Sequence, residues 1–262
     1  MGKDQRVLFH QTVFGPIHSR RLGVSLGVNL SPVDGKVCSF DCLYCEAGFN
    51  SQGPGNAGLP ARETVKAELR SRLEQMKAEG VHPDVITFSG NGEPTVHPDF
   101  AGIVDDTLAL RDELCPQAKV SVLTNSTMLH KPEVVNALLK VDNNILKLDS
   151  AIDSTMRRLD RPGAADFTVG KAVDGLRQFA GTGIVQTMML RGEYGGEPVD
   201  NTTEEEICAL EAAYRAISPR AIMLYSIDRS TPAEQLQKID AEELSAIGRR
   251  IEAETGIHVQ VN

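Results

Sequence analysis

The chain has 262 residues, of which 41% are hydrophobic and 24% charged, and its formal net charge is −9 at pH 7. No apolar run approaches the roughly 20 residues that a membrane-spanning helix needs, and the first residues lack the apolar stretch of a signal peptide, so we expect a cytoplasmic protein with no membrane partner. Because nucleic-acid binding depends on Lys and Arg side chains that neutralise phosphates, the acidic balance makes nucleic acid an unlikely partner.

The N-terminal part of the chain is expected to lead into a loop that is rich in cysteine. Residues 1–22 form a turn-rich lead-in segment, and residues 23–31 alternate apolar with small or polar side chains, as strands do. Residues 38–58 make a long loop that begins with three cysteines and ends in a glycine-rich stretch. A helix is predicted over 61–76, because its apolar residues recur on one helical face.

From there to the end of the chain, strand-like and helix-like segments alternate. The predicted strands are 85–88, 120–124, 145–148, 184–190, 221–225 and 258–261. The predicted helices are 100–114, 132–139, 169–179, 203–217 and 241–254. Helical crossovers of this length connect parallel strands. The pattern therefore predicts an α/β fold with a parallel sheet, arranged as a partial (β/α)6 TIM-like barrel in one domain over residues 1–262. Functional residues are expected at the C-terminal ends of its strands.

Three cysteines, Cys38, Cys42 and Cys45, lie within eight residues at the spacing C-x-x-x-C-x-x-C. Thiolates on one short loop can converge on an inorganic centre. A zinc site would need a fourth ligand, and a disulfide would leave one thiol unpaired. The remaining cysteines, Cys115 and Cys208, are far away and are expected to be free cysteines on helices. We interpret the triad as the ligand set of a four-iron cluster, with one iron left open to a small molecule.

A glycine-rich segment with one carboxylate follows the predicted strand 85–88. Its residues are Gly90, Asn91, Gly92 and Glu93. Glycines let a backbone approach a ligand closely, and carbonyls together with a carboxylate can accept hydrogen bonds from an ammonium group. Taken alone, the segment is more typical of a glycine-rich turn.

Polar or distinctive side chains also follow the next three strands. Thr124 and Asn125 can hydrogen-bond a ligand. Lys147 and Asp149 share one strand face by alternation, so they either project as a charged pair into the barrel mouth or hold the strand as a buried ion pair. Met189 lies in an apolar run that either lines the mouth or packs into the core.

The cysteine loop and the segment 90–94 together resemble the signature of the radical S-adenosylmethionine (SAM) enzymes. The resemblance implies that the three cysteines hold a [4Fe-4S] cluster whose open iron binds SAM, and Tyr44 matches the aromatic residue that precedes the last cysteine. It further implies that Glu93, with Gly90 to Gly92, holds the methionine amino group of SAM. By the same resemblance, Asp149 suits the ribose hydroxyls, Lys147 suits the carboxylate, and the strand of Met189 faces the adenine.

Over nearly its whole length the chain resembles the wyosine-synthase-related iron–sulfur oxidoreductases of this superfamily. The pieces that carry this resemblance are 15–23, 25–29, the cysteine loop, 91–95 and 227–232. The wyosine enzymes add a second cluster from cysteines upstream of the triad and act on tRNA. This chain has no cysteine before Cys38 and is acidic, so we expect a single cluster and a substrate other than tRNA.

The resemblance implies reductive cleavage of SAM to a 5′-deoxyadenosyl radical, which abstracts hydrogen from an unidentified small-molecule, peptide or protein substrate. An electron donor such as flavodoxin or ferredoxin is the implied partner. Arg20, Arg21 and Arg229 lie in loops near the predicted mouth and are candidates to bind a carboxylate or phosphate. The alternatives are a tRNA-modifying enzyme of wyosine type, an iron–sulfur electron carrier without catalysis, and a zinc-stabilised binding module.

Overall fold

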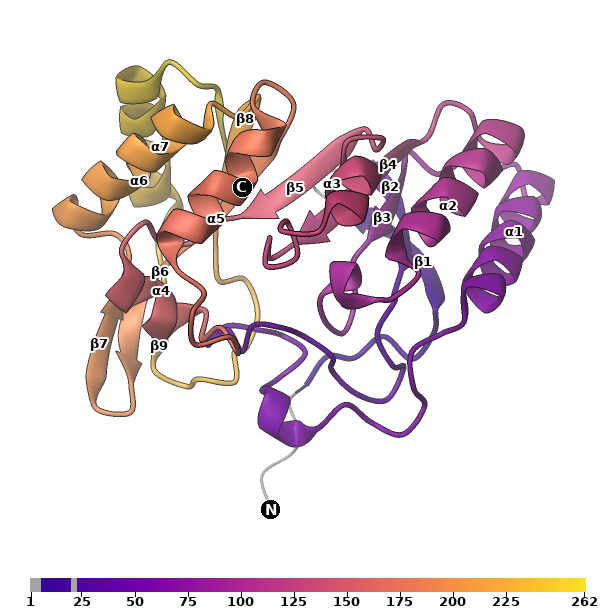
Figure 1. Cartoon of the computed structure of the whole chain (residues 1–262), viewed down its shortest axis with the longest axis horizontal. Coiled ribbons are helices and arrows are strands. Elements are labelled where there is room, and N and C mark those ends of the chain that lie inside the picture. Colours follow the sequence, from indigo (N-terminus) through magenta and orange to yellow (C-terminus); the bar gives the residue numbers. More distant parts are fainter. Residues whose placement is uncertain (1–5, 20–22) are drawn as a thin grey trace.

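The computed structural model describes residues 6–19 and 23–262 (Figure 1). The strands are β1 Val13–Ser19, β2 Gly23–Val28, β3 Val85–Phe88, β4 Lys119–Thr124, β5 Asn143–Lys147, β6 Ile184–Tyr194, β7 Glu197–Asp200, β8 Ala221–Ser226, β9 Leu236–Lys238 and β10 Val259–Val261. The α-helices are α1 Arg62–Ala78, α2 Phe100–Leu114, α3 Pro132–Leu138, α4 Asp153–Leu159, α5 Val169–Leu176, α6 Glu204–Ile217 and α7 Ala241–Thr255. Short 3-10 helices are η1 Asn50–Gln52, η2 Pro94–Val96 and η3 Arg177–Phe179.

The main sheet is a partial barrel of parallel strands, as predicted. Its order is β1-β2-β3-β4-β5-β6-β8-β10, and every neighbouring pair is parallel except β1 with β2. Each parallel step is crossed by helix, with α1, α2, α3, the α4–α5 segment, α6 and α7 in turn. Among the described strands, β1 and β10 stand at the two ends of this order and do not pair with each other. The barrel is therefore open along one side.

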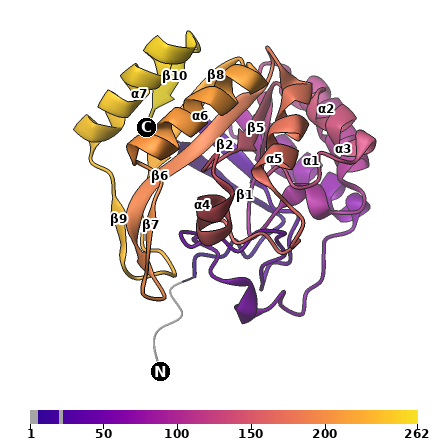
Figure 2. The same cartoon turned by 60° about the vertical axis from the view of Figure 1, so that its left-hand side comes forward.

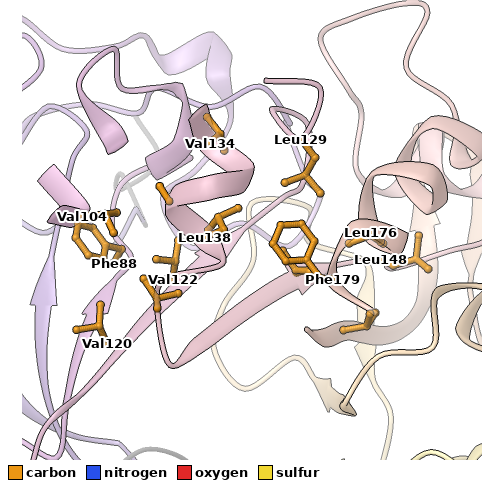
Figure 3. Close-up of a cluster of buried hydrophobic side chains, with 14 of the residues drawn as sticks. Phe88, Val104, Val120, Val122, Leu129, Val134, Leu138, Leu148, Leu176 and Phe179 are labelled. Atoms are coloured by element: carbon orange, nitrogen blue, oxygen red, sulfur yellow. The ribbon is translucent and has the colours of Figure 1, made fainter. Parts of the chain in front are cut away.

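The main hydrophobic core lies between the sheet and the helices outside it. Figure 3 shows part of it, where Phe88, Val120 and Val122 from β3 and β4 lie near Val104 and Leu138 from the helices. All five side chains are buried. Burial of this kind on the outer face leaves the inner face of the strands free to carry polar residues toward the barrel mouth.

Three segments differ from the sequence-based prediction. The lead-in segment contains β1, which pairs antiparallel with β2 with a register shift between Phe14 and Ile17. The stretch expected to be loop after β5 contains α4, a helix of only 7 residues, too short for a clear amphipathic period. Strand β6 continues to Tyr194 because it pairs there with β7 and β9. Figures 1 and 2 place this ribbon on the same side of the molecule as the loops after β2.

None of the helices in the described part of the chain combines the length and apolarity that crossing a bilayer requires.

An ion pair between α6 and α7 supports a pH-dependent prediction about stability. Arg250 donates from Nη1 to Glu204 Oε2 at 2.5 Å and from Nη2 to Glu204 Oε1 at 2.7 Å, and these bonds lower the pKa of Glu204 to about 2. Because the folded-state pKa is below the ordinary value of 4.5, the pair stabilises the fold fully above that value and less as the pH falls toward 2. Glu204→Gln should lower the urea midpoint of unfolding at pH 7. The difference between the midpoints of the wild type and the variant should become smaller below pH 4.5. The matched control is Glu205→Gln on the same helical turn. A difference in urea midpoint between wild type and Glu204→Gln that stays constant down to pH 3 would contradict the prediction.

Candidate active site

The cysteine loop follows β2 and is fixed to the end of α4 by backbone hydrogen bonds. The Asp41 N–H donates to the carbonyl of Asp160 at 2.9 Å, and the Leu43 N–H donates to the carbonyl of Leu159 at 3.0 Å. Leu43 is fully buried, and its own carbonyl accepts from the Ala233 N–H at 3.2 Å. The three cysteines are therefore presented by a loop that is held from two sides.

Asp41, between the first two cysteines, is the centre of a set of charged contacts. Its carboxylate accepts from the Asn50 N–H at 2.6 Å and pairs with Arg161 at 3.2 Å and Lys36 at 3.6 Å. The Arg161 guanidinium also lies over the rings of Phe49 and Tyr194, 5.0 and 5.3 Å from their centroids. Arg161 has a φ of 50°, in the left-handed region that few side chains adopt. The ion pair with Asp41 and the contacts with the two rings offset the free-energy cost of this backbone conformation. The sequence did not single out Arg161, because α4, the helix that precedes it, was not predicted.

Replacing Arg161 by alanine should loosen the cysteine loop without unfolding the barrel. The variant loses the ion pair with Asp41 and the contacts with two rings, each of which contributes on the order of 1 kcal/mol when partly buried. Hydrogen exchange of the Asp41 and Leu43 amides should therefore speed up several-fold. The control is Arg177→Ala, because this arginine is 62% exposed and pairs with Asp174 three residues before it. Unchanged exchange in Arg161→Ala would show that the backbone bonds alone hold the loop.

Hydrogen-bond donors face two of the three sulfur atoms. Asn125 Nδ2 lies 3.6 Å from Cys38 Sγ, and Lys147 Nζ lies 3.8 Å from Cys42 Sγ. Burial raises the pKa of Cys42 and, with the Glu93 charge, raises that of Cys38 to about 12. Without a bound metal, the thiols of Cys38 and Cys42 therefore stay protonated, and the Cys42 thiol donates to Asp160 Oδ1 at 3.4 Å. Binding of a metal centre must displace these protons, and the facing donors then stabilise the sulfur charge.

Lys147, Asp149 and Tyr44 form one buried cluster, which confirms that Lys147 and Asp149 share the inner face of the sheet. Lys147 Nζ pairs with Asp149 Oδ2 at 2.9 Å and lies 3.7 Å from Asp160. The Tyr44 hydroxyl makes short contacts with both Lys147 and Asp149. Burial alone would lower the pKa of Lys147, but Asp149, Cys42 and Asp160 together raise it well above its ordinary value. Burial and the Asp149 charge raise the pKa of Asp160. Lys147 is therefore cationic, and Asp149 is its main counterion.

Met189 does not face this cluster, so its assignment to the wall of the mouth is wrong. Met189 is fully buried in the core between sheet and helices, whereas Met188 packs with Cys42, Leu43 and Tyr44. The register explains the difference, because Gln186, two residues before Met188, is the strand partner of the inward-facing Lys147. Alternation along the strand could have identified Met188 from the sequence.

Asn201 supports Asp149 and was missed from the sequence. It is fully buried, and its Nδ2 donates to the carbonyls of Asp149 at 2.7 Å and Met188 at 2.6 Å. Its Oδ1 accepts from the Leu190 N–H at 2.9 Å. It comes from the loop after β7, a strand that the sequence pattern did not reveal.

Glu93 links the ends of β3 and β4. Its Oε1 accepts from the N–H and hydroxyl of Thr95, at 3.0 and 2.5 Å, and from Thr124 Oγ1 at 2.6 Å, while its Oε2 accepts from the Asn125 N–H at 2.6 Å. Burial raises the pKa of Glu93, although these four bonds oppose the shift. A carboxylate offers about four acceptor positions, so protein groups fill most of them. Thr124 contacts Glu93, and Asn125 turns its amide toward the cysteine loop.

The other residues of the glycine-rich segment hold it against the cysteine loop. A Cβ on Gly92 would lie 1.9 Å from the carbonyl of Val37, which itself accepts from the Glu93 N–H at 3.0 Å. A Cβ on Gly90 would similarly meet the Asn29 side chain at 2.3 Å. Asn91 is fully buried and donates to the carbonyl of Pro32 at 2.9 Å. Only glycine at positions 90 and 92 allows the two loops to approach this closely.

The remaining site predictions have mixed outcomes. Arg229 is 60% exposed and pairs with Glu46 at 2.6 Å, just after the last cysteine. Arg20 and Arg21 lie outside the described residues.

No three Cys, His, Asp or Glu side chains in the described ranges are grouped as one metal ion would require.

Comparison with known proteins decides the family. The profile of the Radical SAM superfamily matches residues 33–193, a segment that contains the cysteine loop, strands β3 to β5 and all but the last residue of β6. The chain belongs to the radical SAM superfamily. Radical SAM proteins use a [4Fe-4S] cluster and SAM, so the superfamily and both cofactors predicted from the sequence are confirmed.

Individual similarities agree with this membership of the radical SAM superfamily. The chain is 29% identical to a protein named GTPase Obg from Brachyspira hyodysenteriae, over 99% of this chain and 36% of that protein. It is 32% identical to a UPF0026 protein from Methanocaldococcus jannaschii, over 73% of this chain and 58% of that protein. The chain thus spans between about one third and three fifths of the length of these two curated relatives.

Two solved structures show the same radical SAM fold at low sequence identity. A radical SAM methyltransferase from Sphaerobacter thermophilus superposes with a TM-score of 0.64 at 14% identity, covering 91% of this chain and 65% of that chain. TYW1 with a lysine-pyruvate adduct bound gives a TM-score of 0.59 at 13% identity, covering 87% of this chain and 73% of that chain. At these identities the likeness establishes the fold.

Proposed function

We propose that this enzyme cleaves SAM reductively and uses the resulting 5′-deoxyadenosyl radical to abstract hydrogen from a small-molecule or peptide substrate. The observation that carries the proposal is the convergence of the cysteine loop with the Tyr44–Lys147–Asp149 cluster at the C-terminal ends of the strands. That convergence fits a cluster and SAM bound side by side. When bound, the cluster supplies the electron that breaks the sulfonium bond.

In this proposal Cys38, Cys42 and Cys45 ligate the cluster, and protein donors stabilise their sulfurs. Asn125 Nδ2 and Lys147 Nζ already face Cys38 and Cys42. The fit is supported by a loop that is fixed in place before any metal binds, which lowers the ordering cost of assembling the site.

The chain's polar residues would orient SAM. Asp149 hydrogen-bonds the ribose hydroxyls and Lys147 pairs with the carboxylate, with Tyr44 between them. The methionine amino group is held by the backbone carbonyls of the segment from Gly90 to Gly92 and by Glu93. Because Glu93 already accepts four hydrogen bonds, its larger contribution is to fix this backbone. Thr124 assists by donating to Glu93, and Met188 packs beside the adenine.

Further parts of the proposal concern the chain as a whole. Residues 1–262 form a single radical SAM domain, which is supported by one continuous order of strands from β1 to β10. The net charge of −9 argues against tRNA as the substrate. The free cysteines of the described chain suit the cytoplasm, where thiols stay reduced. An electron donor such as flavodoxin or ferredoxin would supply the electron.

The experiment is anaerobic reconstitution of the full chain with iron and sulfide, followed by addition of dithionite and SAM. We expect a brown protein that forms 5′-deoxyadenosine and methionine in equal amounts, together with an electron paramagnetic resonance signal that changes when SAM is added. A reconstituted cluster that SAM leaves spectroscopically unchanged would point instead to an electron carrier. Zinc retained in place of iron would contradict the assignment of an iron–sulfur cluster to this site.

A further inference from the structure

A separate cavity of about 250 Å³ lies inside the barrel, below the charged cluster. It touches all six consecutive parallel strands from β2 to β8, which places it on the concave face of the sheet. The residues that line it are Phe9, Phe14, Ile17, Ser25, Gly27, Thr87, Ser89, Leu123, Ile145, Gln186 and Met223.

The N-terminal segment closes one side of this cavity with two stacked aromatic rings. The rings of Phe9 and Phe14 are 3.8 Å apart between centroids and inclined by 17°. The tip of the Phe14 ring lies against Gly27, where a Cβ would come within 2.1 Å of the ring. Asn91 fixes Phe9 through both backbone groups, accepting from its N–H at 2.8 Å and donating to its carbonyl at 2.9 Å. Asn91 thus builds a wall of the cavity as well as supporting the glycine-rich loop.

The described residues that line the cavity carry no charge. None of the described lining residues has an ionisable side chain. The hydroxyls of Ser25 and Thr87 hydrogen-bond each other at 3.0 Å. By contrast, the Ser89 hydroxyl and the Gln186 amide make no side-chain hydrogen bond to any other described residue. An otherwise apolar cavity therefore offers one amide and one hydroxyl to a guest.

The cavity adjoins the proposed SAM site. Gln186 is the register partner of Lys147 on the neighbouring strand, and Ser89 immediately precedes Gly90. A molecule in the cavity would therefore lie one row of side chains below the residues that orient SAM. A molecule at this position would lie within reach of a radical formed at the mouth of the barrel.

We propose that this cavity receives the substrate, and that the part of the substrate that enters it is uncharged, compact and largely apolar. This inference rests on the proposed function. A cavity of about 150 Å³ accommodates benzene, so by proportion this one takes about ten non-hydrogen atoms. An amide, alcohol or carbonyl group of the substrate hydrogen-bonds to Gln186 and Ser89. A carboxylate or ammonium group is excluded, because burying a charge without a partner is costly.

The test compares four fragments of matched size, benzamide, toluene, benzoate and benzylammonium, for binding to the reconstituted full chain by ligand-observed NMR. We expect benzamide to bind at least tenfold more tightly than either charged fragment. Ile145→Phe fills the cavity and should weaken benzamide at least tenfold. Gln186→Leu removes the amide without adding bulk, so it should abolish the preference for benzamide over toluene even if Ile145→Phe folds poorly.

The matched control is Gln178→Leu, which lines a different groove of about 620 Å³ between α5 and the loop after β4. It should leave benzamide binding unchanged. Any of three results would overturn the inference. The charged fragments could bind as tightly as benzamide, benzamide could show no detectable binding, or both cavity variants could leave benzamide binding unchanged. Fragment binding does not require SAM cleavage, so a wild-type protein that binds benzamide but forms no 5′-deoxyadenosine would refute the proposed function alone.

Discussion

Cys42→Ala should abolish both the iron–sulfur cluster and the reductive cleavage of SAM. Cys42 is the most buried of the three cysteines, and its sulfur is the one that Lys147 and Asp160 both contact. Removing it leaves two thiols, which cannot retain a four-iron cluster with only one open position. Reconstituted Cys42→Ala protein should lack the visible absorption of the cluster, and its formation of 5′-deoxyadenosine should fall to the level of a protein-free reaction.

Cys208→Ala is the control for loss of a thiol elsewhere. Cys208 is exposed on α6, where it contacts Glu204 and Arg250. This variant should bind iron and cleave SAM as the wild type does. The assignment fails if Cys42→Ala still assembles a cluster with wild-type iron content, or if Cys208→Ala loses it.

Asp149→Ala should lower the free energy of unfolding by about 3 kcal/mol, the lower end of the cost of breaking a buried ion pair. The side chain of Asp149 is 0% exposed, and its removal deprives Lys147 of its closest counterion and the Met188 N–H of its acceptor. The loss stays at the lower end because Asp160 remains 3.7 Å from Lys147. Urea unfolding of the metal-free chain measures the change.

A double variant separates the structural role of this pair from its proposed role in binding SAM. Lys147→Met combined with Asp149→Asn removes both charges and keeps an acceptor for the Met188 N–H. It should recover more than half of the lost stability, yet bind SAM as weakly as Asp149→Ala. Recovery of both properties would show that the pair only holds the sheet together. Recovery of neither would mean that the hydrogen bonds of Asp149, and not its charge, stabilise the fold.

The parts of the fold that the sequence predicted well are those with a strong local period. Strand β3 and helix α2 have the predicted bounds, since a continuous apolar run of four residues and a regular helical face leave little choice. The segments that were missed depend on distant partners. Strand β1 exists because β2 is beside it, and the far half of β6 exists because β7 and β9 pair with it.

The same distinction applies to the site. The cysteine triad and the pair Lys147 and Asp149 were visible because spacing and alternation are local properties. Arg161 and Asn201 act only through contacts made across the fold, with Asp41 and with Asp149 respectively. Their neighbouring sequence gives no period or motif that identifies them. Met189 was a failure of a different kind, because the alternation that would have selected Met188 was available and was not applied.

The open seam of the barrel also has a consequence for self-association. An incomplete barrel has two edge strands, and unpaired edges can recruit a strand from another molecule and start aggregation. Here one edge is β10, which has only 3 residues. The other is β1, which is interrupted by a register shift and contains Pro16, a residue with no N–H to offer. Neither edge is a good template for a foreign strand, so the side of the barrel can stay open to ligands without inviting aggregation.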